Sequence, residues 1–190
     1  LEQSLEFEAL VSALSSGFIN LRPGEVDREI EDALRRICEA LDIDLAILWQ
    51  WSQARPDVIA PTHVYQAHQG PRPSEPMRQD LYPWTRQQML MGRVVAIPAL
   101  EAFPAEAAVD RETLRSFGIK SAMALPLAVG GKAPIGALGL NSLLAQRDWP
   151  DALVKRLQLV AQVFTNALTR ERYEQRLLES EARLAASADL

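Results

Sequence analysis

From Asp151 to Leu190 the sequence contains neither glycine nor proline, and its apolar residues recur at helical spacing. A single helix over this stretch would be about 60 Å long, roughly twice the diameter of a small domain. Its first part carries enough apolar residues to pack on a globular body, whereas the part beyond Thr169 is rich in Arg, Glu and Gln. We therefore expect a globular body from which a stiff helix extends.

The extending part of this helix needs a partner, because most helical stability in proteins comes from packing. Leu177 and Leu184 lie seven residues apart, as in a coiled-coil seam, and Glu179 and Arg183 form an i, i+4 pair. The alternative is a frayed tail. We predict a homodimer through the N- and C-terminal helices, and the residues predicted for the C-terminal dimer helix are Phe164, Tyr173, Leu177 and Leu184.

The remainder of the chain alternates between helical and strand-like periodicity. Helices are predicted over 5–19, 26–41, 84–91 and 104–117, and the last helix is predicted to begin with Asp148 as its N-cap. Strands are predicted over 45–51, 58–66 and 94–98, and residues 68–83 are predicted to be largely loop. A hairpin is predicted from strands 121–129 and 135–143, which flank Gly130-Gly131-Lys132.

The first strand of this hairpin has one large face and one small face. Met123 and Leu125 alternate with Ala122 and Ala124, so the large face can fill a core. The small face has two explanations that the sequence does not separate. It is either the surface on which a helix packs closely or the floor of a ligand cavity.

Composition excludes several classes of function. The formal net charge is −5 with a pI near 5.1, which disfavours nucleic-acid binding through clustered Lys and Arg. No apolar run is long enough for a membrane span, and no signal peptide precedes the first helix, so we expect a cytoplasmic fragment without a membrane segment. The chain begins with Leu1, and both ends are helical in pattern, so we expect a piece of a longer polypeptide.

Residues that could carry catalysis are scarce. Cys38 is the single cysteine, and it lies on the apolar stripe of the helix over 26–41, which predicts a buried thiol. His63 and His68 are the two histidines, and their spacing is not that of metal ligands. We predict no catalytic residue, no metal site and no cofactor, and therefore no enzyme in this fragment. An unknown small ligand remains compatible with the pattern.

The order of elements resembles that of a GAF domain of the kind found in bacterial multi-domain sensor histidine kinases. The resemblance covers roughly residues 5 to 170. It rests on ALRRICEALDIDLAILWQW (33–51), FGIKSAMALPLAVGGKAPIGALGLNS (117–142) and WPDALVKRLQLVAQVFTNAL (149–168), while LLESEARL (177–184) resembles a linker that leads into a PAS domain.

This resemblance implies an α+β, profilin-like fold: a central antiparallel sheet of five or six strands, with the terminal helices on one face and loops and short helices on the other. It implies three segments, namely an N-terminal linker or dimer helix (1–22), a GAF-like sensory domain (23–168) and a helical linker (169–190) toward a PAS or kinase module. The implied role is sensory, within a two-component phosphorelay, with an effector domain in the same polypeptide as partner.

Better-defined subfamilies are not matched. The Asn-Lys-Phe-Asp-Glu signature of cyclic-nucleotide-binding members is missing, and Cys38 does not occupy the place of the cysteine that holds bilins in related domains. A domain that only dimerises is the main alternative, and an enzyme on the same fold is a remote one. If a ligand binds, the candidates to touch it from the loop-rich side are His63, Tyr65, Trp84, Met89 and Ser121.

Overall fold

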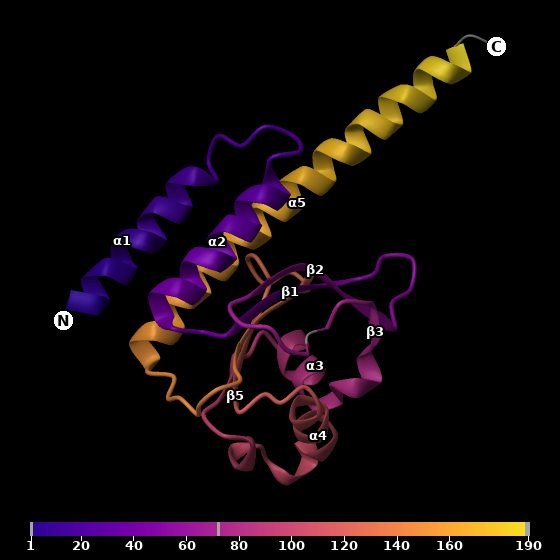
Figure 1. Ribbon diagram of the computed structural model, residues 1–190. Coiled ribbons are helices and arrows are strands. Elements are labelled where there is room, and N and C mark those ends of the chain that lie inside the picture. Colours follow the sequence, from indigo (N-terminus) through magenta and orange to yellow (C-terminus); the bar gives the residue numbers. More distant parts are fainter. Residues whose placement is uncertain (1, 72, 189–190) are drawn as a thin grey trace.

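In a computed structural model, residues 2–71 and 73–188 are described, and they form a six-stranded antiparallel sheet with helices on both faces (Figure 1). The strand order across the sheet is β3-β2-β1-β6-β5-β4. The strands are β1 (Leu45–Trp51), β2 (Val58–Gln66), β3 (Met77–Arg78), β4 (Val95–Ile97), β5 (Ser121–Pro126) and β6 (Gly136–Ser142). The helices are α1 (Glu2–Gly17), α2 (Val26–Leu41), α3 (Pro83–Leu90), α4 (Ala108–Ser116) and α5 (Asp151–Ala188), with short 3-10 turns η1 (Gln79–Leu81), η2 (Leu100–Ala102) and η3 (Ala105–Ala107). The expected fold class is confirmed.

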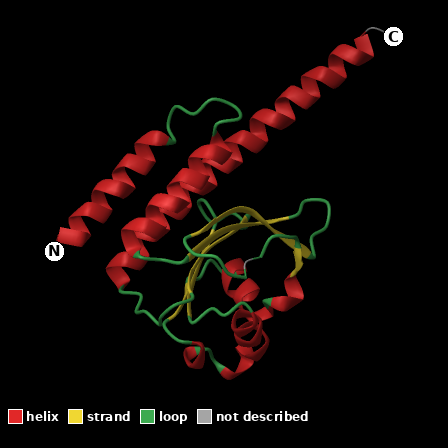
Figure 2. Ribbon diagram, in the orientation of Figure 1, coloured by secondary structure: helices red, strands yellow, loops and turns green. Residues whose placement is uncertain are grey.

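One face of the sheet is covered by α2 and α5, and α1 packs against these two helices on their far side (Figure 2). Alternating strand residues such as Leu48, Leu125 and Leu138 point into this layer and are fully buried. From the helices they meet Leu34 and Phe164, which are also fully buried. This layer is the main hydrophobic core of the described residues.

The helix α1 belongs to this same core. Phe7, Val11, Leu14 and Phe18 are buried against the other two helices, and the Phe18 and Phe164 rings meet edge to face with centroids 5.6 Å apart. The segment predicted as a separate linker helix (1–22) therefore packs on the body over much of its length.

Most of the predicted helices and strands are present in the structure, with small changes at their boundaries. The predicted loop over 68–83 contains β3 and η1, and the predicted helix over 104–117 begins as the turn η3 before α4. The last helix begins at Asp151, so the prediction that Asp148 caps it is wrong. The indole Nε1 of Trp149 donates to Ile97 O (3.2 Å) and Ser121 Oγ (3.1 Å), which ties this residue to β4 and β5, and the helix begins only after it.

The long C-terminal helix is confirmed as one continuous element, α5, which extends well beyond the body (Figure 1). Leu157, Val160, Phe164 and Leu168 are buried in the core, and large apolar residues beyond Thr169 are exposed. Among the residues that the structure describes, no helix has both the length and the apolar composition needed to cross a bilayer.

Candidate functional site

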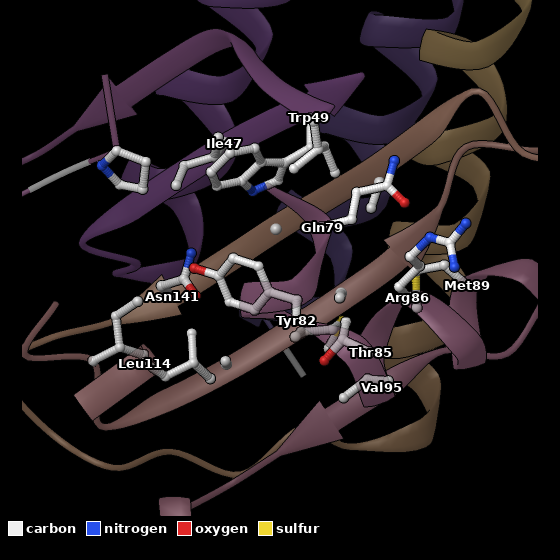
Figure 3. A pocket seen from close by; sticks show the side chains of 18 of the residues that line it. Ile47, Trp49, Gln79, Tyr82, Thr85, Arg86, Met89, Val95, Leu114 and Asn141 are labelled. Atoms are coloured by element: carbon white, nitrogen blue, oxygen red, sulfur yellow. The ribbon is translucent and has the colours of Figure 1, made fainter. Parts of the chain in front are cut away.

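The second face of the sheet, opposite the three long helices, encloses a cavity of about 90 Å³ beneath α3, α4 and the turn before α3. Figure 3 shows Trp49 and Tyr82 across from each other in it, with Asn141 toward one end and Arg86 toward the other. The rings of Trp49 and Tyr82 have centroids 6.2 Å apart. Most side chains that line the cavity are apolar, as is usual for small-molecule sites.

The floor of the cavity is a row of small residues in the middle of the sheet. Ala124 in β5 pairs with Gly139 in β6, which in turn pairs with Ile47 in β1. Ala137 and Ala122 extend the floor to either side. These residues have little or no side chain to fill the space beneath the helices, so a gap remains between the sheet and the helices above it. Both explanations for the small face of the hairpin hold in part, because α3 packs on β5 and the cavity lies between the sheet and this helix.

The roof is held in place by a buried carboxylate. Asp110 in α4 is fully buried, and its two oxygens accept hydrogen bonds from the backbone N–H groups of Trp84 (3.1 Å) and Thr85 (2.8 Å). These N–H groups belong to the first turn of α3, where such donors lack partners within the helix. Asp110 therefore caps α3 from a neighbouring helix and fixes Thr85 and Met89 above the floor.

Few polar groups line this cavity. Asn141 Nδ2 donates a long hydrogen bond of 3.5 Å to Leu45 O, and Gln79 Nε2 donates to Pro56 O at 2.7 Å. Burial raises the pKa of the Tyr82 phenol, and the nearby Asp110 carboxylate raises it further, so Tyr82 is a neutral hydroxyl over the physiological range. The site thus offers neutral hydrogen-bonding groups in apolar surroundings.

The structure does not bring the five predicted ligand residues together. Met89 lines the cavity, whereas Trp84 lies beside it in an apolar cluster and meets the Phe103 ring edge to face at 5.8 Å. Ser121 is fully buried, and its Oγ donates to Ile97 O at 3.0 Å.

His63 and Tyr65 lie on the opposite face of the sheet from the cavity. His63 pairs with Leu48 of β1 and Tyr65 pairs with Ala46 of β1, and both partners face the long helices. Side chains of directly paired residues point to the same face of a sheet, so His63 and Tyr65 also face the long helices. The prediction that they lie on the loop-rich side is therefore wrong. Any contact of these residues with a ligand stays a prediction.

His63 instead anchors a polar cluster on the helix face. Its ring is buried, with Nε2 2.7 Å from Asp27 Oδ1 and Nδ1 2.9 Å from Thr62 Oγ1. A carboxylate only accepts hydrogen bonds, so Nε2 donates to Asp27, and in the neutral ring the Thr62 hydroxyl donates to Nδ1. The cluster ties the first turn of α2 to β2.

This cluster continues to the point where α5 leaves the body. Gln50 Nε2 donates to Thr62 Oγ1 at 2.7 Å, and Arg172 Nη2 donates to Gln50 Oε1 at 2.5 Å. Partial burial, with Asp27 nearby, raises the pKa of Glu171 on the same stretch of helix. A chain of hydrogen bonds therefore joins the sheet to the start of the extending helix.

Metal and thiol chemistry find little support in the residues described. Within 2–71 and 73–188, no group of three or more His, Cys, Asp or Glu side chains is placed to hold a metal ion. Cys38 is buried in the core beneath α2, as predicted, and burial raises the pKa of its thiol to about 12. The thiol is therefore protonated and lies on the far side of the sheet from the cavity.

The residues predicted for a dimer helix divide into two groups. Phe164 is fully buried in the core of its own chain, so it cannot contact a second copy directly. Tyr173, Leu177 and Leu184 are exposed at 67%, 49% and 68%. Leu178 joins them at 61%. The exposed residues all lie on the part of α5 beyond the body.

Several residues of the cavity were missed by sequence reasoning, among them Trp49, Gln79, Tyr82 and Asn141. Trp49 and Asn141 could have been found, because each lies on the same strand face as the small residues. Gln79 and Tyr82 lie in a segment that was predicted to be loop, where no periodicity indicates which side chains turn inward.

Comparison with known proteins identifies this architecture. Residues 25–168 match the family described as GAF domain. No curated protein matches the sequence significantly. Many solved structures are similar in fold, and three of them are described next.

The GAF domain region of a Geobacter sulfurreducens PCA protein is 16% identical, with a TM-score of 0.64 over 76% of this chain and 93% of that one. The phycocyanobilin-bound GAF domain of a cyanobacterial phytochrome is 13% identical, with a TM-score of 0.72 over 88% and 96%. The blue-light absorbing form of the PixJ GAF domain of Thermosynechococcus elongatus is 16% identical, with a TM-score of 0.65 over 82% and 92%. The TM-scores show a shared fold.

Proposed function

Because this chain belongs to the GAF-domain family, whose members are sensory and regulatory modules, we propose that it senses a small molecule in the cavity between the sheet and α3. The main support for this proposal is a row of small residues on one face of the sheet, which leaves space for a cavity in an otherwise well-packed domain. These residues are Ala122, Ala124, Ala137 and Gly139. One of the similar structures is described as phycocyanobilin-bound and another as a blue-light absorbing form, which supports a small ligand in a domain of this fold.

A thermal-shift screen tests this proposal. A ligand present at 100 times its dissociation constant adds about 2.7 kcal/mol to stability, which is readily detected in a domain of this size. The variant Ala124→Leu fills the cavity and is expected to abolish the shift, while Ala102→Leu at an exposed position is expected to retain it. A ligand that stabilises the wild type and Ala124→Leu equally would contradict the proposal.

We also propose that the protein forms a homodimer through the exposed part of α5, with an effector domain of the same polypeptide beyond it. The exposure of Tyr173, Leu177 and Leu184 on a long unpacked helix supports pairing with a second copy. Sedimentation is expected to show twice the monomer mass. The double variant Leu177→Glu with Leu184→Glu is expected to be monomeric, and Val109→Glu on exposed α4 is the control. A monomeric wild type would contradict this.

The finer context that we propose is a cytoplasmic sensor histidine kinase of a bacterial two-component system. The likeness of 177–184 to a linker that precedes a PAS domain supports it, as does the direction of α5 away from the body. The flanking sequence of the gene is the test. A phosphoacceptor histidine helix downstream is expected, and an effector of another class would contradict the proposal.

A domain that dimerises without a ligand is the second candidate, and the size of the cavity favours it. At about 90 Å³ the cavity is smaller than the roughly 300–1,000 Å³ of common ligand pockets. In that case a broad library should give no thermal shift while the dimer persists. The thermal-shift screen therefore distinguishes the two candidate functions.

A further inference from the structure

An unused hydrogen-bond acceptor lies beside the cavity. Gln79 is only 7% exposed, and its Oε1 has no hydrogen-bond partner among residues 2–71 and 73–188. Gln79 is one of the residues that line the cavity. Buried acceptors in folded proteins are nearly always paired, so an orphan beside a cavity indicates a missing donor.

The orientation of this amide is fixed by its neighbours. Gln79 Nε2 donates to Pro56 O at 2.7 Å, and the backbone N–H of Gln79 donates to Asp57 O at 2.9 Å. Exchanging the amide nitrogen and oxygen would place two acceptor oxygens at that distance. Oε1 is therefore the unpaired atom, and it can only accept.

The surroundings limit the charge of a ligand. Among the described residues that line the cavity, Arg86 is the single charged side chain, and it is exposed at the mouth. A cation would find no carboxylate there. An anion would lose its hydration without a buried positive partner, which is strongly unfavourable. The cavity therefore suits an uncharged molecule.

Size and shape limit the ligand further. A cavity of about 150 Å³ holds benzene in another protein, so about 90 Å³ admits one small ring once flexible side chains yield. Met89, unbranched and fully buried at the roof, is the side chain best able to move. The rings of Trp49 and Tyr82 supply flat walls.

We propose that the cavity binds a small uncharged ring compound that donates an O–H or N–H hydrogen bond to Gln79 Oε1. This inference rests on the proposed ligand-sensing function and adds the class of ligand. It also assigns Gln79 a role in specificity, since an apolar ring of the same shape would leave Oε1 unpaired.

Phenol and toluene test this proposal, because they have the same shape and differ by a hydroxyl in place of a methyl group. Calorimetric titration of the wild-type chain is expected to show phenol binding about tenfold more tightly than toluene. In Gln79→Met, which keeps the side-chain length without the acceptor, the preference is expected to disappear. The Gln79 side-chain amide signals of the ¹⁵N-labelled wild type are expected to shift more with phenol than with toluene, because toluene acts on them through its ring alone.

The outcomes separate the two proposals. Binding of both compounds with equal affinity, or a phenol preference that survives in Gln79→Met, would overturn the role of Gln79 and leave the cavity as a ligand site. Binding of neither compound would overturn the ring-compound proposal. The library screen with Ala124→Leu then decides separately whether the cavity binds any ligand. The amide signals of the wild type give a result even if Gln79→Met does not fold.

Discussion

On one face of the sheet, Leu48, Leu125 and Leu138 are fully buried against long helices; on the other, the same strands present Ala124 and Gly139 to a hollow. The strands are shared, so the contrast arises entirely from the alternation of side chains. The helix face supplies the packing that holds the domain together, and the cavity face gives up part of that packing. A division of this kind lets one sheet combine a stable scaffold with space for a ligand.

The two glycines of β6 sharpen this contrast, because Gly136 is closed in by the backbone of β1 whereas Gly139 faces the hollow. A Cβ on Gly136 would lie 1.8 Å from the backbone oxygen of Trp49, whereas a Cβ on Gly139 would meet its nearest atom, Trp49 Nε1, at 3.4 Å. Gly136→Ala is expected to cost about 3 kcal/mol or more, because backbone must move. Gly139→Ala is expected to be neutral or to stabilise by about 0.5 kcal/mol. Urea unfolding measures both, and equal costs would contradict the contrast.

A matched pair of alanines tests packing density on the two faces. Ala46 is fully buried beneath the helices, and Ala124 lines the cavity. Ala46→Leu is expected to destabilise the domain by about 1–3 kcal/mol through overpacking. Ala124→Leu is expected to stay within about 1 kcal/mol of the wild type, because the cavity accepts the added atoms. The reverse ranking in thermal or urea unfolding would show that the cavity is closed in solution.

The polar cluster is the exception on the packed face. His63→Ala is expected to cost about 1–2 kcal/mol, because it removes the contacts to Asp27 and Thr62. His68→Ala, at an exposed position, is expected to change the free energy of unfolding by less than about 0.5 kcal/mol. Comparable urea midpoints for the two variants would indicate that the cluster adds nothing to stability.

The smallest effect is expected for the thiol on the packed face. Burial raises the pKa of Cys38 to about 12, so the folded state favours the protonated thiol more than the unfolded state does. This contribution to stability is complete below the ordinary thiol pKa and is lost as the pH rises toward the folded value. At pH 8 the thiol is expected to react with a disulfide reagent only as fast as the domain unfolds. Rapid labelling without denaturant would contradict its placement.

The sequence was sufficient for most of the fold, because periodicity determined it. The strands over 45–51 and 58–66 and the helix over 26–41 recur with the predicted boundaries, since each has a regular apolar pattern. The start of α5 was missed because Trp149 is held by hydrogen bonds to distant residues, which no local pattern reveals.

The candidate site was predictable only in part. The small face of β5 indicated a cavity floor as one of two explanations, but the part of the lining that holds Gln79 and Tyr82 comes from a segment without periodicity. His63 and Tyr65 were placed on the wrong face because periodicity gives the alternation along β2 and not its pairing with β1. That pairing is irregular between Leu48 and Trp49, so the register shifts between Pro61 and His63.

The continuity of α5 has a mechanical consequence. The same unbroken helix contributes Leu157 and Phe164 to the core and then runs on to Ala188 without a glycine or proline at which it could hinge. From Leu168 to Ala188 it reaches about 30 Å, so rocking its seated end by about 5° swings its tip sideways by about 2.6 Å. A small change of packing where α5 contacts the core would therefore produce a larger displacement at the far end of the helix.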